Sequence, residues 1–465
     1  MKFFLLPITL LVIYSMGLLV ATLPFVTGDV YNEKRFFEII LLLVTLLSHV
    51  FVRYQFPISP FYKLLLIGVI CLGLISVTAA QASNYAFIEF TIFTALLCYA
   101  VFVSNLHKYY EDIVRYYTYV VMYAAFLYFF VFIISYFAAL THEVGYDWDE
   151  LFFGFVNIRF FNQYQIWLLP FMTLALLHCK AVIWTRVIFV ITVIWWALLF
   201  LSVARGAMLA IVCTGILLLV IYGNTITKYL KLHAALAIVG WAVNLILFHL
   251  IPDLIREEYY VRSWLTVDSP ERLKFWGQAL IMIKENALLG IGPMHFSLET
   301  LNHPHSSVLQ WGGEWGIPSL ILMVTLSISA LRAWFISFNK IFYKRNQESE
   351  LANETLALTY AVVSGLGYSL VSGVIVMPLS QITMFTTVGL MLGHYWNYFP
   401  AKIYKPFVKH ELVIWRGFIL ILTVLFVAAL NDIGTQDRIM GKQQSLEKIN
   451  VHGPRLWRIG GIPHD

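Results

Sequence analysis

The sequence predicts an all-α polytopic membrane protein with about 12 to 13 transmembrane helices and a large external loop that carries amphipathic helices. Of its 465 residues, 60% are hydrophobic and only 12% are charged, which is too little charge to cover a soluble protein of this length. Apolar runs of about 20 residues recur along the chain, and each can cross a hydrocarbon core of ~30 Å. Helices are expected because every backbone polar group must be satisfied within lipid.

The apolar runs define the expected spans. We interpret the first run as a transmembrane helix and not as a signal peptide, because it is long and no A-x-A cleavage site follows it. In chain order the predicted spans are 3–22, 36–52, 64–81, 85–104, 116–140, 164–179, 182–203, 206–222, 233–251, 317–337, 356–376, 380–397 and 413–430.

The positions of Lys and Arg predict the orientation of these spans. If the N-terminus is cytoplasmic, basic residues fall in alternate loops along the whole chain: Arg53, Lys63, Lys108, Arg115, Lys180, Lys228, Lys231, Lys340, Lys344, Arg345, Lys402, Lys405 and Lys409. The long segments 141–163 and 252–304 then lie on the outer side. In a bacterial inner membrane this would be the periplasmic face.

This topology divides the chain into four successive segments. We expect an N-terminal transmembrane bundle at 1–251, a large periplasmic loop at 252–316, C-terminal transmembrane helices at 317–430, and a short basic tail at 431–465. The tail is periplasmic if the number of spans is odd. No separate soluble domain is indicated.

The cysteines and histidines favour neither a disulfide framework nor a metal site. All four cysteines, Cys71, Cys98, Cys179 and Cys213, lie in or beside apolar spans. The His-Pro-His sequence at 303–305 has no further ligands nearby and is a poor metal site. We therefore expect no metal and no cofactor.

Arg205 interrupts a long apolar stretch in "LLFLSVARGAMLAIVC". A charge there is costly unless it meets water, a counter-ion or a ligand. Its small neighbours leave room for a bulky anion, and a guanidinium binds phosphate in a bidentate manner. The alternative is an arginine that reaches the interface with its charged end.

A second arginine stands at the start of a predicted amphipathic helix, in "VDSPERLKFWGQALIMIKEN". Ser269 and Pro270 form a typical helix start, and apolar residues then recur at helical spacing. Arg272 would lie in the first turn, where the helix dipole favours an anion. A solvated arginine is the simpler interpretation.

His305 precedes a predicted helix start in "HPHSSVLQWGGEWGIP". Gly312 and Gly316 follow on nearly the same helical face. They predict either a slot for a polyprenyl chain or sugar beneath the imidazole, or close helix packing of the G-x-x-x-G type. A histidine at the water boundary can polarise a hydroxyl or bind phosphate. Glu314 lies half a turn off this face, so no carboxylate is well placed as a base.

A cluster of polar side chains lies just before the predicted span at 164–179. Arg159, Asn162, Gln163 and Gln165 could hydrogen-bond a glycan or an acceptor, with His303 as a further candidate. The aromatic residues around them are explained equally well by interfacial anchoring. Together with the two arginines and the histidine, this cluster suits a large anionic ligand with an oily tail.

Three motifs in this order, "SVARGA", "RLKFWGQALIMIKENALLGIGP" and "HPHSSVLQWGGEWGIP", resemble the O-antigen ligase and polymerase superfamily. Its members include lipid A core–O-antigen ligases, O-antigen polymerases and bacterial protein O-oligosaccharyltransferases. The family pattern falls on His305, Ser306 and Gly316, although the usual Asn after the histidine is Ser here, and Pro318-Ser319 replaces the usual residues after the later Gly.

The resemblance implies a metal-independent glycosyltransferase whose donor is a glycan on undecaprenyl diphosphate and whose bond forms on the periplasmic side. It implies that Arg205 and Arg272 hold the diphosphate and that His305 orients or activates the acceptor hydroxyl, or helps hold the diphosphate. The pilin-type protein O-oligosaccharyltransferases look nearest. A lipid A core ligase and an O-antigen polymerase stay open, and a transporter of lipid-linked sugars is the alternative from a different class.

Overall fold

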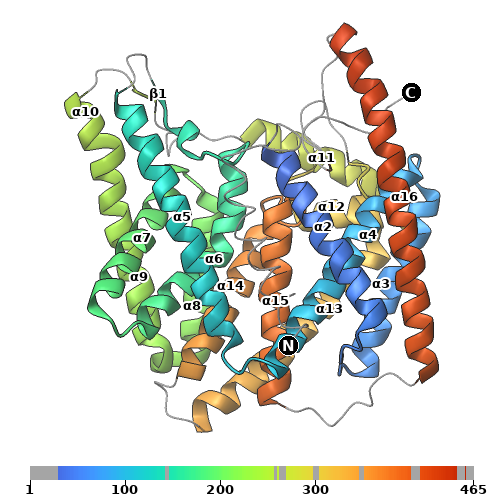
Figure 1. Ribbon diagram of the computed structural model, residues 1–465, viewed down its shortest axis with the longest axis horizontal. Helices are drawn as coiled ribbons and strands as arrows, with labels where there is room; N and C mark the ends of the chain where they lie inside the picture. Colours follow the sequence, from blue (N-terminus) through green and yellow to red (C-terminus); the bar gives the residue numbers. More distant parts are fainter. Residues whose placement is uncertain are drawn as a thin grey trace. The chain divides into compact units, whose positions relative to one another are not determined.

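The computed structural model describes residues 30–141, 146–255, 259–260, 269–296, 303–344, 350–399, 409–447 and residue 456. Most of these residues are helical (Figure 1). The strands in the described part are two residues long, and β1 (Tyr146–Asp147) pairs in parallel with β2 (Tyr259–Tyr260). The predicted all-α fold class is therefore confirmed.

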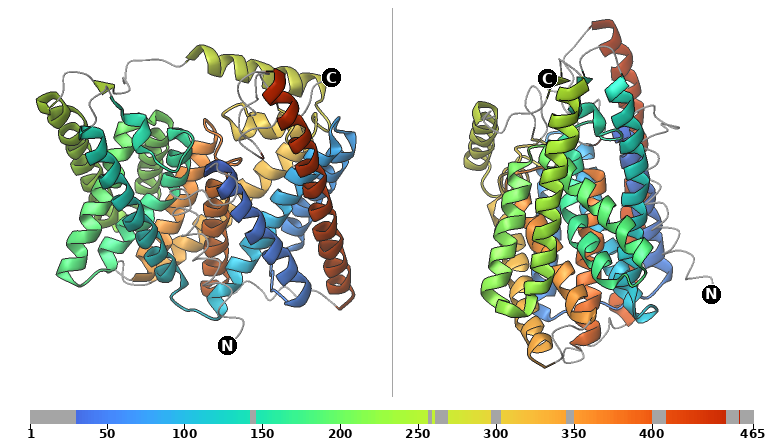
Figure 2. Two further views of the ribbon diagram at one scale, coloured as in Figure 1. Left: turned by 45° about the horizontal axis from the view of Figure 1, so that its top comes forward. Right: turned by 90° about the vertical axis from the view of Figure 1, so that its left-hand side faces the viewer.

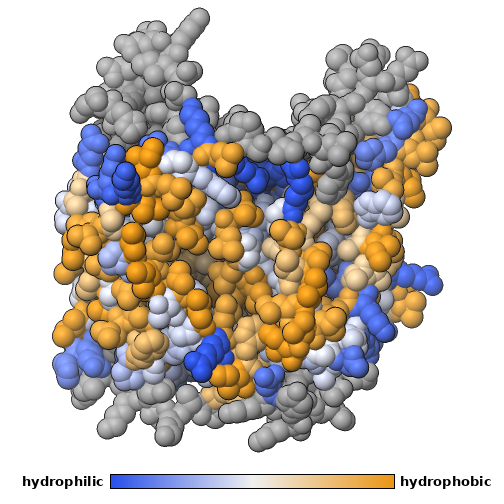
Figure 3. All heavy atoms as spheres, turned by 180° about the vertical axis from the view of Figure 1, so that it is seen from behind, coloured by the Kyte–Doolittle hydropathy of each residue, from blue (hydrophilic) through white to orange (hydrophobic). Residues whose placement is uncertain are grey.

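The predicted spans coincide with helices wherever the structure describes them. Every predicted span after the first overlaps a helix, and the first, at 3–22, lies outside the described residues. Seven stretches in the described part are long and apolar enough to cross a membrane. Apolar residues cover most of the described surface seen in Figure 3, as expected for lipid-facing helices. The chain is thus a polytopic membrane protein, while the full count of 12 to 13 spans stays a prediction.

The helices form two compact units, and neither is a continuous stretch of chain. The first unit contains the described residues within 1–37, 106–267 and 338–368. In it, α7 packs against α5, α6 and α9. Its elements are α5 (Ile113–Thr141), the 3-10 helix η3 (Trp148–Leu151), α6 (Ile158–His178), α7 (Val182–Leu201), α8 (Arg205–Tyr222), η4 (Gly223–Ile226), α9 (Thr227–Leu245), the π-helical turn η5 (Ile246–Leu250), α10 (Ile251–Ile255) and α14 (Glu350–Ser369), whose last residue is in the other unit.

Large aromatic side chains fill the core of the first unit. Trp167 of α6 and Trp195 of α7 are fully buried. A Cβ at Gly365 of α14 would lie 2.3 Å from the Trp167 indole, so the absence of a side chain lets the ring pack directly on α14. Close packing of this kind through small residues is how helices associate in lipid.

The second unit contains the described residues within 38–105, 268–337 and 369–465. In it, α4 packs against α3, α15 and α16, while α12 packs against α11 and α3 (Figure 1 and Figure 2). Its elements are α3 (Pro60–Ala79), α4 (Ser83–Ser104), α11 (Ser269–Glu285), α12 (Ser307–Trp315), α15 (Pro378–Tyr398), α16 (Lys409–Glu447) and most of α2 (Val30–Phe51) and α13 (Ile317–Lys344), while η2 (Asn105–Lys108) begins at its border.

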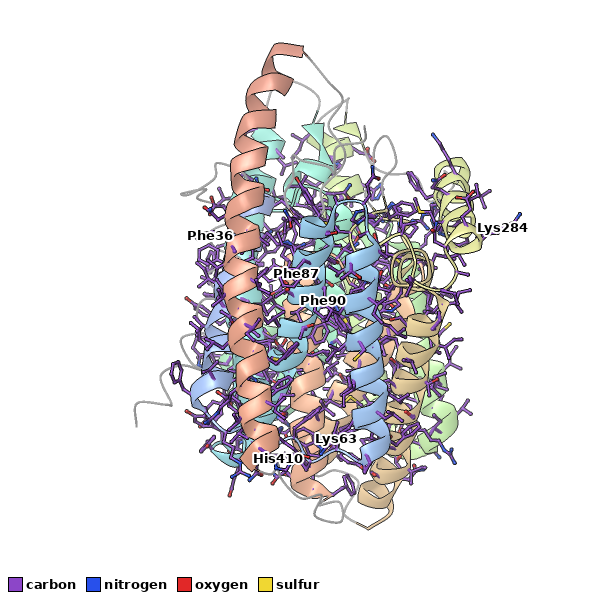
Figure 4. All side chains as sticks on the ribbon, turned by 90° about the vertical axis from the view of Figure 1, so that its right-hand side faces the viewer. Phe36, Lys63, Phe87, Phe90, Lys284 and His410 are labelled. Atoms are coloured by element: carbon purple, nitrogen blue, oxygen red, sulfur yellow. The ribbon has the colours of Figure 1, made fainter. Side chains whose placement is uncertain are left out.

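Two features of the second unit bear on the predicted topology. Lys63 and His410 lie at one end of this unit, and Lys284 lies at the other (Figure 4). The predicted topology requires the ends of this unit to lie at opposite faces of the membrane, and the side on which each loop lies stays a prediction. The final helix α16 continues to Glu447, beyond the end at 430 that hydrophobicity predicts.

Candidate functional site

His305 lies in a tight turn directly before α12. Its backbone φ of 54° is in the left-handed region that side chains other than glycine rarely adopt. Ser306 caps the helix that follows, since its hydroxyl accepts a hydrogen bond from the Leu309 N–H at 3.5 Å. The predicted helix start after the histidine is thus present. Unusual backbone of this kind tends to persist where the surroundings hold a side chain in one direction.

His303 accepts a hydrogen bond from the backbone of this turn. The His305 N–H donates to Nδ1 of His303 at 3.3 Å, and the two imidazoles meet nearly edge to face with centroids 4.5 Å apart. An accepting Nδ1 leaves the His303 proton on Nε2. The His303 side chain is only 1% exposed. The expected contact of His303 with a glycan or acceptor therefore has no support from this structure, because the residue is almost fully buried.

Gly373 makes room for the His303 ring. A Cβ at Gly373, between α14 and α15, would lie 2.8 Å from Cε1 and 3.0 Å from Nδ1 of His303. Sequence reasoning did not identify this glycine, because it lies far along the chain from the histidine.

The amphipathic helix α11 carries Arg272 to the same part of the second unit. Phe275 of α11 contacts the His305 ring with centroids 5.9 Å apart. Phe275 also belongs to an apolar cluster with Ala279 and Phe296. Arg272 is exposed and lies one helical turn before Phe275. The structure therefore brings the segments of Arg272 and His305 together.

Glu314 holds the loop after α11 to α12. Its side chain is fully buried, and Oε1 accepts from the Phe296 N–H at 2.9 Å. Its backbone oxygen accepts from the Gly292 N–H at 3.0 Å and from the Ser76 hydroxyl at 3.1 Å. Through these contacts Glu314 ties the loop after α11 to α12 and to α3.

His295 joins the same loop to the start of α4. Its Nε2 accepts from the Ala82 N–H at 2.9 Å, and Nδ1 donates to the Pro293 carbonyl at 2.8 Å. Gly292, with φ of 109°, lets this loop approach Ala80 closely. Sequence reasoning missed His295 and gave Glu314 no role, although the glycine-rich "GIGPMH" does signal a tight loop here.

Replacing Glu314 with alanine should lower the free energy of unfolding by about 1 to 3 kcal/mol, because the buried Phe296 N–H would lose its acceptor. The thermal unfolding midpoint in detergent measures this change. The matched control is the exposed Glu111→Ala, which should stay within about 0.5 kcal/mol of wild type. Equal midpoints for the two variants would contradict the proposed role of the carboxylate.

The faces of Gly312 and Gly316 are filled by protein. A Cβ at Gly312 would lie 3.1 Å from Cδ1 of Ile283 in α11, and one at Gly316 would lie 2.3 Å from the Leu288 carbonyl oxygen. Gly316 also ends α12 with a φ of 82°. The predicted lipid slot is therefore not present at these glycines, and close packing is the interpretation that the structure supports.

Arg205 is the first residue of α8 in the other unit. It is exposed, and it follows a sharp turn in which Val203 has φ of 49°. The Arg205 N–H donates to the Val203 carbonyl at 2.9 Å, which closes the turn. The guanidinium is thus presented at a helix start, where backbone N–H groups also favour an anion.

The polar cluster at the start of α6 holds this turn in place. Arg159 donates to the carbonyls of Ser202 and Val203 at 3.0 and 3.3 Å. Asn162 donates to the Ser202 hydroxyl at 2.9 Å, and Gln165 donates to the Trp195 carbonyl. Arg159 and Asn162 thus support the turn that precedes Arg205, while Gln165 ties α6 to α7.

The expected role of this cluster in glycan binding needs correction. Asn162, Gln163 and Gln165 are at most 1% exposed, so their amides cannot contact a glycan in this structure. The half-buried Arg159 is already bonded to two carbonyls. The sequence placed these side chains at the membrane boundary but could not show whether they face water or the helix α7.

Comparison with known proteins gives one family. Residues 188–324 match the family model described as O-Antigen ligase. The matched range runs from α7 into α13 and includes Arg205, Arg272 and His305. A search of curated proteins finds no match. Among the described residues, no group of three His, Cys, Asp or Glu side chains could hold a metal ion.

Proposed function

We propose, from the match of residues 188–324 to the O-antigen ligase family model, that this protein transfers a glycan from undecaprenyl diphosphate to an acceptor hydroxyl. The family supports a glycan transferase of the ligase or polymerase type. The proposed reaction takes place at the periplasmic face of a bacterial inner membrane. The favoured acceptor is a pilin-like protein, which would make the enzyme a protein O-oligosaccharyltransferase.

The observation that carries the proposal is the presentation of His305. The imidazole lies on a left-handed turn before α12, and it contacts the helix that carries Arg272. A histidine held in this way beside an exposed guanidinium suits a reaction between a hydroxyl and a phosphate ester. Arg205, from the same family-matched range, is the second candidate for diphosphate binding.

The reaction assigns a role to each of the three residues. The acceptor oxygen forms a bond to the anomeric carbon of the first sugar, and the bond from that carbon to the diphosphate breaks. The electron pair of the broken bond goes to the diphosphate, whose charge Arg205 and Arg272 stabilise. The hydroxyl proton passes to His305. No metal is assigned a role.

The choice of acceptor rests on the sequence around "HPHSSVLQWGGEWG" and "RFFNQYQIWLLP", which resembles that of protein O-oligosaccharyltransferases. A lipid A core–O-antigen ligase or an O-antigen polymerase would use the same donor and the same three residues. A transporter of lipid-linked sugars would need no histidine at a water boundary.

A competition between acceptors tests the proposal. The purified protein is reconstituted with an undecaprenyl diphosphate-linked glycan, a pilin-like protein and a lipid A core, and the products are identified by mass. We expect glycan on the protein. Glycan on the lipid, or longer lipid-linked chains, would overturn the protein acceptor in favour of a ligase or a polymerase. Movement of the lipid-linked glycan between leaflets without transfer would overturn the enzyme proposal altogether.

A further inference from the structure

The outer face of α11 combines exposed aliphatic and basic side chains. Leu273, Leu280 and Ile281 are each more than half exposed, and Lys274 and Lys284 are exposed beside them. At 100° per residue these five side chains fall on one side of the helix. The opposite side, which carries Phe275 and Ala279, is buried against its own unit. The exposed face is therefore not a part of the protein core.

The end of α11 is fixed to the start of a membrane-spanning helix. The Ile317 N–H, at the first residue of α13, donates to the Ala287 carbonyl at 2.8 Å. Gly316 packs directly on the backbone of Leu288, whose side chain is 73% exposed. Residues 317–339 form one of the stretches able to cross a membrane. Leu288 must then lie at the depth where that span begins.

The lipid-facing surface of α13 continues toward Leu288. Ile317, Ile321, Val324 and Ile328 are exposed and recur at helical spacing along this span, of which only 11% is buried within the protein. The helix α11 runs crosswise to α4 and α16 (Figure 1 and Figure 2), and Lys284 points away from its unit (Figure 4). The helix α11 is therefore not aligned with the spans of its unit.

We propose that α11 lies in the membrane–water boundary and binds anionic phospholipid. Leu273, Leu280, Ile281 and Leu288 enter the boundary of the acyl chains, while Lys274 and Lys284 contact the lipid phosphates. An apolar face flanked by lysines is the pattern that binds anionic membrane surfaces. The charge of the two lysines distinguishes this surface from the uncharged lipid-facing stripe of α13.

The consequence for activity rests on the proposed function. Arg272 is on α11, and Phe275 of α11 contacts His305. Docking of α11 would therefore hold these two residues at the level of the headgroups, where the diphosphate of a polyprenyl donor lies. Glycan transfer should then depend on anionic lipid through Lys274 and Lys284.

The first test measures depth and needs no glycan. Cys71, Cys179 and Cys213 are replaced by serine, the buried Cys98 is kept, and a fluorescent probe is attached at Leu280→Cys in vesicles of phosphatidylethanolamine and phosphatidylglycerol. Lipids brominated on the acyl chain should quench this probe nearly as well as one at Ile328→Cys in α13. A probe at the exposed Glu111→Cys should be unquenched.

Two results of the depth test would overturn the proposal. One is a Leu280→Cys probe that brominated lipid leaves unquenched and aqueous iodide quenches, because the face would then be in water. The other is a probe protected from both quenchers, which would indicate that a protein covers this face.

The second test measures whether the docking of α11 depends on the charge of the lipid. With the depth probe in place, raising the phosphatidylglycerol fraction should increase quenching several-fold, and Lys274→Ala/Lys284→Ala should remove that increase. The matched control, Lys63→Ala at the other end of the unit, should keep it. An increase that persists in the double variant would overturn the role of the lysines. A protein that shows this behaviour but transfers no glycan would retain the lipid site and lose the proposed function.

Discussion

Replacing His305 with alanine should reduce glycan transfer by about 10²- to 10⁴-fold, the usual contribution of a positioned acid or base. The half-buried ring contacts Phe275 and His303. The hydrogen bond to His303 comes from the His305 backbone, so removal of the ring leaves this bond in place. The main effect should therefore fall on the turnover rate and not on folding. Initial rates with purified donor and acceptor, together with the thermal unfolding midpoint, measure both.

The matched control for this variant is His410→Ala. His410 is exposed at the start of α16, at the end of the second unit away from Lys284 (Figure 4). It should transfer glycan at the wild-type rate. A His305→Ala enzyme with unchanged turnover would remove the histidine from the chemistry and leave the arginines to explain the reaction. A lowered affinity for the donor, with normal turnover once saturated, would assign His305 to diphosphate binding.

Hydrophobicity predicted the helical part of this fold because the bilayer imposes a simple rule on the sequence. A run of about 20 apolar residues can hardly be anything but a span. Arg205 and His305 were singled out from the sequence because a charge or an imidazole among apolar residues requires a reason, and their roles stay predictions. The structure adds that His305 has a positive φ and that Val203, two residues before Arg205, has one as well.

The parts that the sequence could not predict depend on contacts between distant segments. Asn162 and Gln165 are polar residues of the kind found at binding surfaces, but both are buried in α6, which packs against α7. From the sequence, Gly312 could line a slot for a ligand or a contact between helices, and only the position of Ile283 in another helix shows that it is a contact. His303 and Glu314 likewise owe their roles to partners that no local pattern reveals.

The sequence also could not predict which helices pack together. Residues 38–105 cluster with 268–337 and with the region after 369, although long stretches of chain separate them. Hydropathy locates each helix along the chain, but it does not say which helices are neighbours. The predicted division into successive segments therefore describes the order of the chain, and the packing follows a different division.

Replacing Gly373 with alanine should lower glycan transfer by about 10²-fold, because a displacement of ~1 Å at a reacting group has an effect of that size. The new Cβ would lie 2.8 Å from the His303 ring, which is buried. The ring must then shift, and the His305 N–H loses its acceptor on Nδ1. Turnover should fall more than donor affinity, since the imidazole is misdirected while the arginines are untouched.

Gly417→Ala in α16 is the matched control, because nothing lies within 4 Å of its added Cβ. It should keep full activity and gain up to about 1 kcal/mol of stability from the better helix propensity of alanine. A further variant, His303→Ala, distinguishes an effect on the position of His305 from general damage to the fold. If Gly373 acts only by accommodating His303, the Gly373→Ala/His303→Ala double variant should be as active as His303→Ala alone. Losses that add, or a fully active Gly373→Ala enzyme, would contradict the idea that His303 transmits the effect of this glycine to His305.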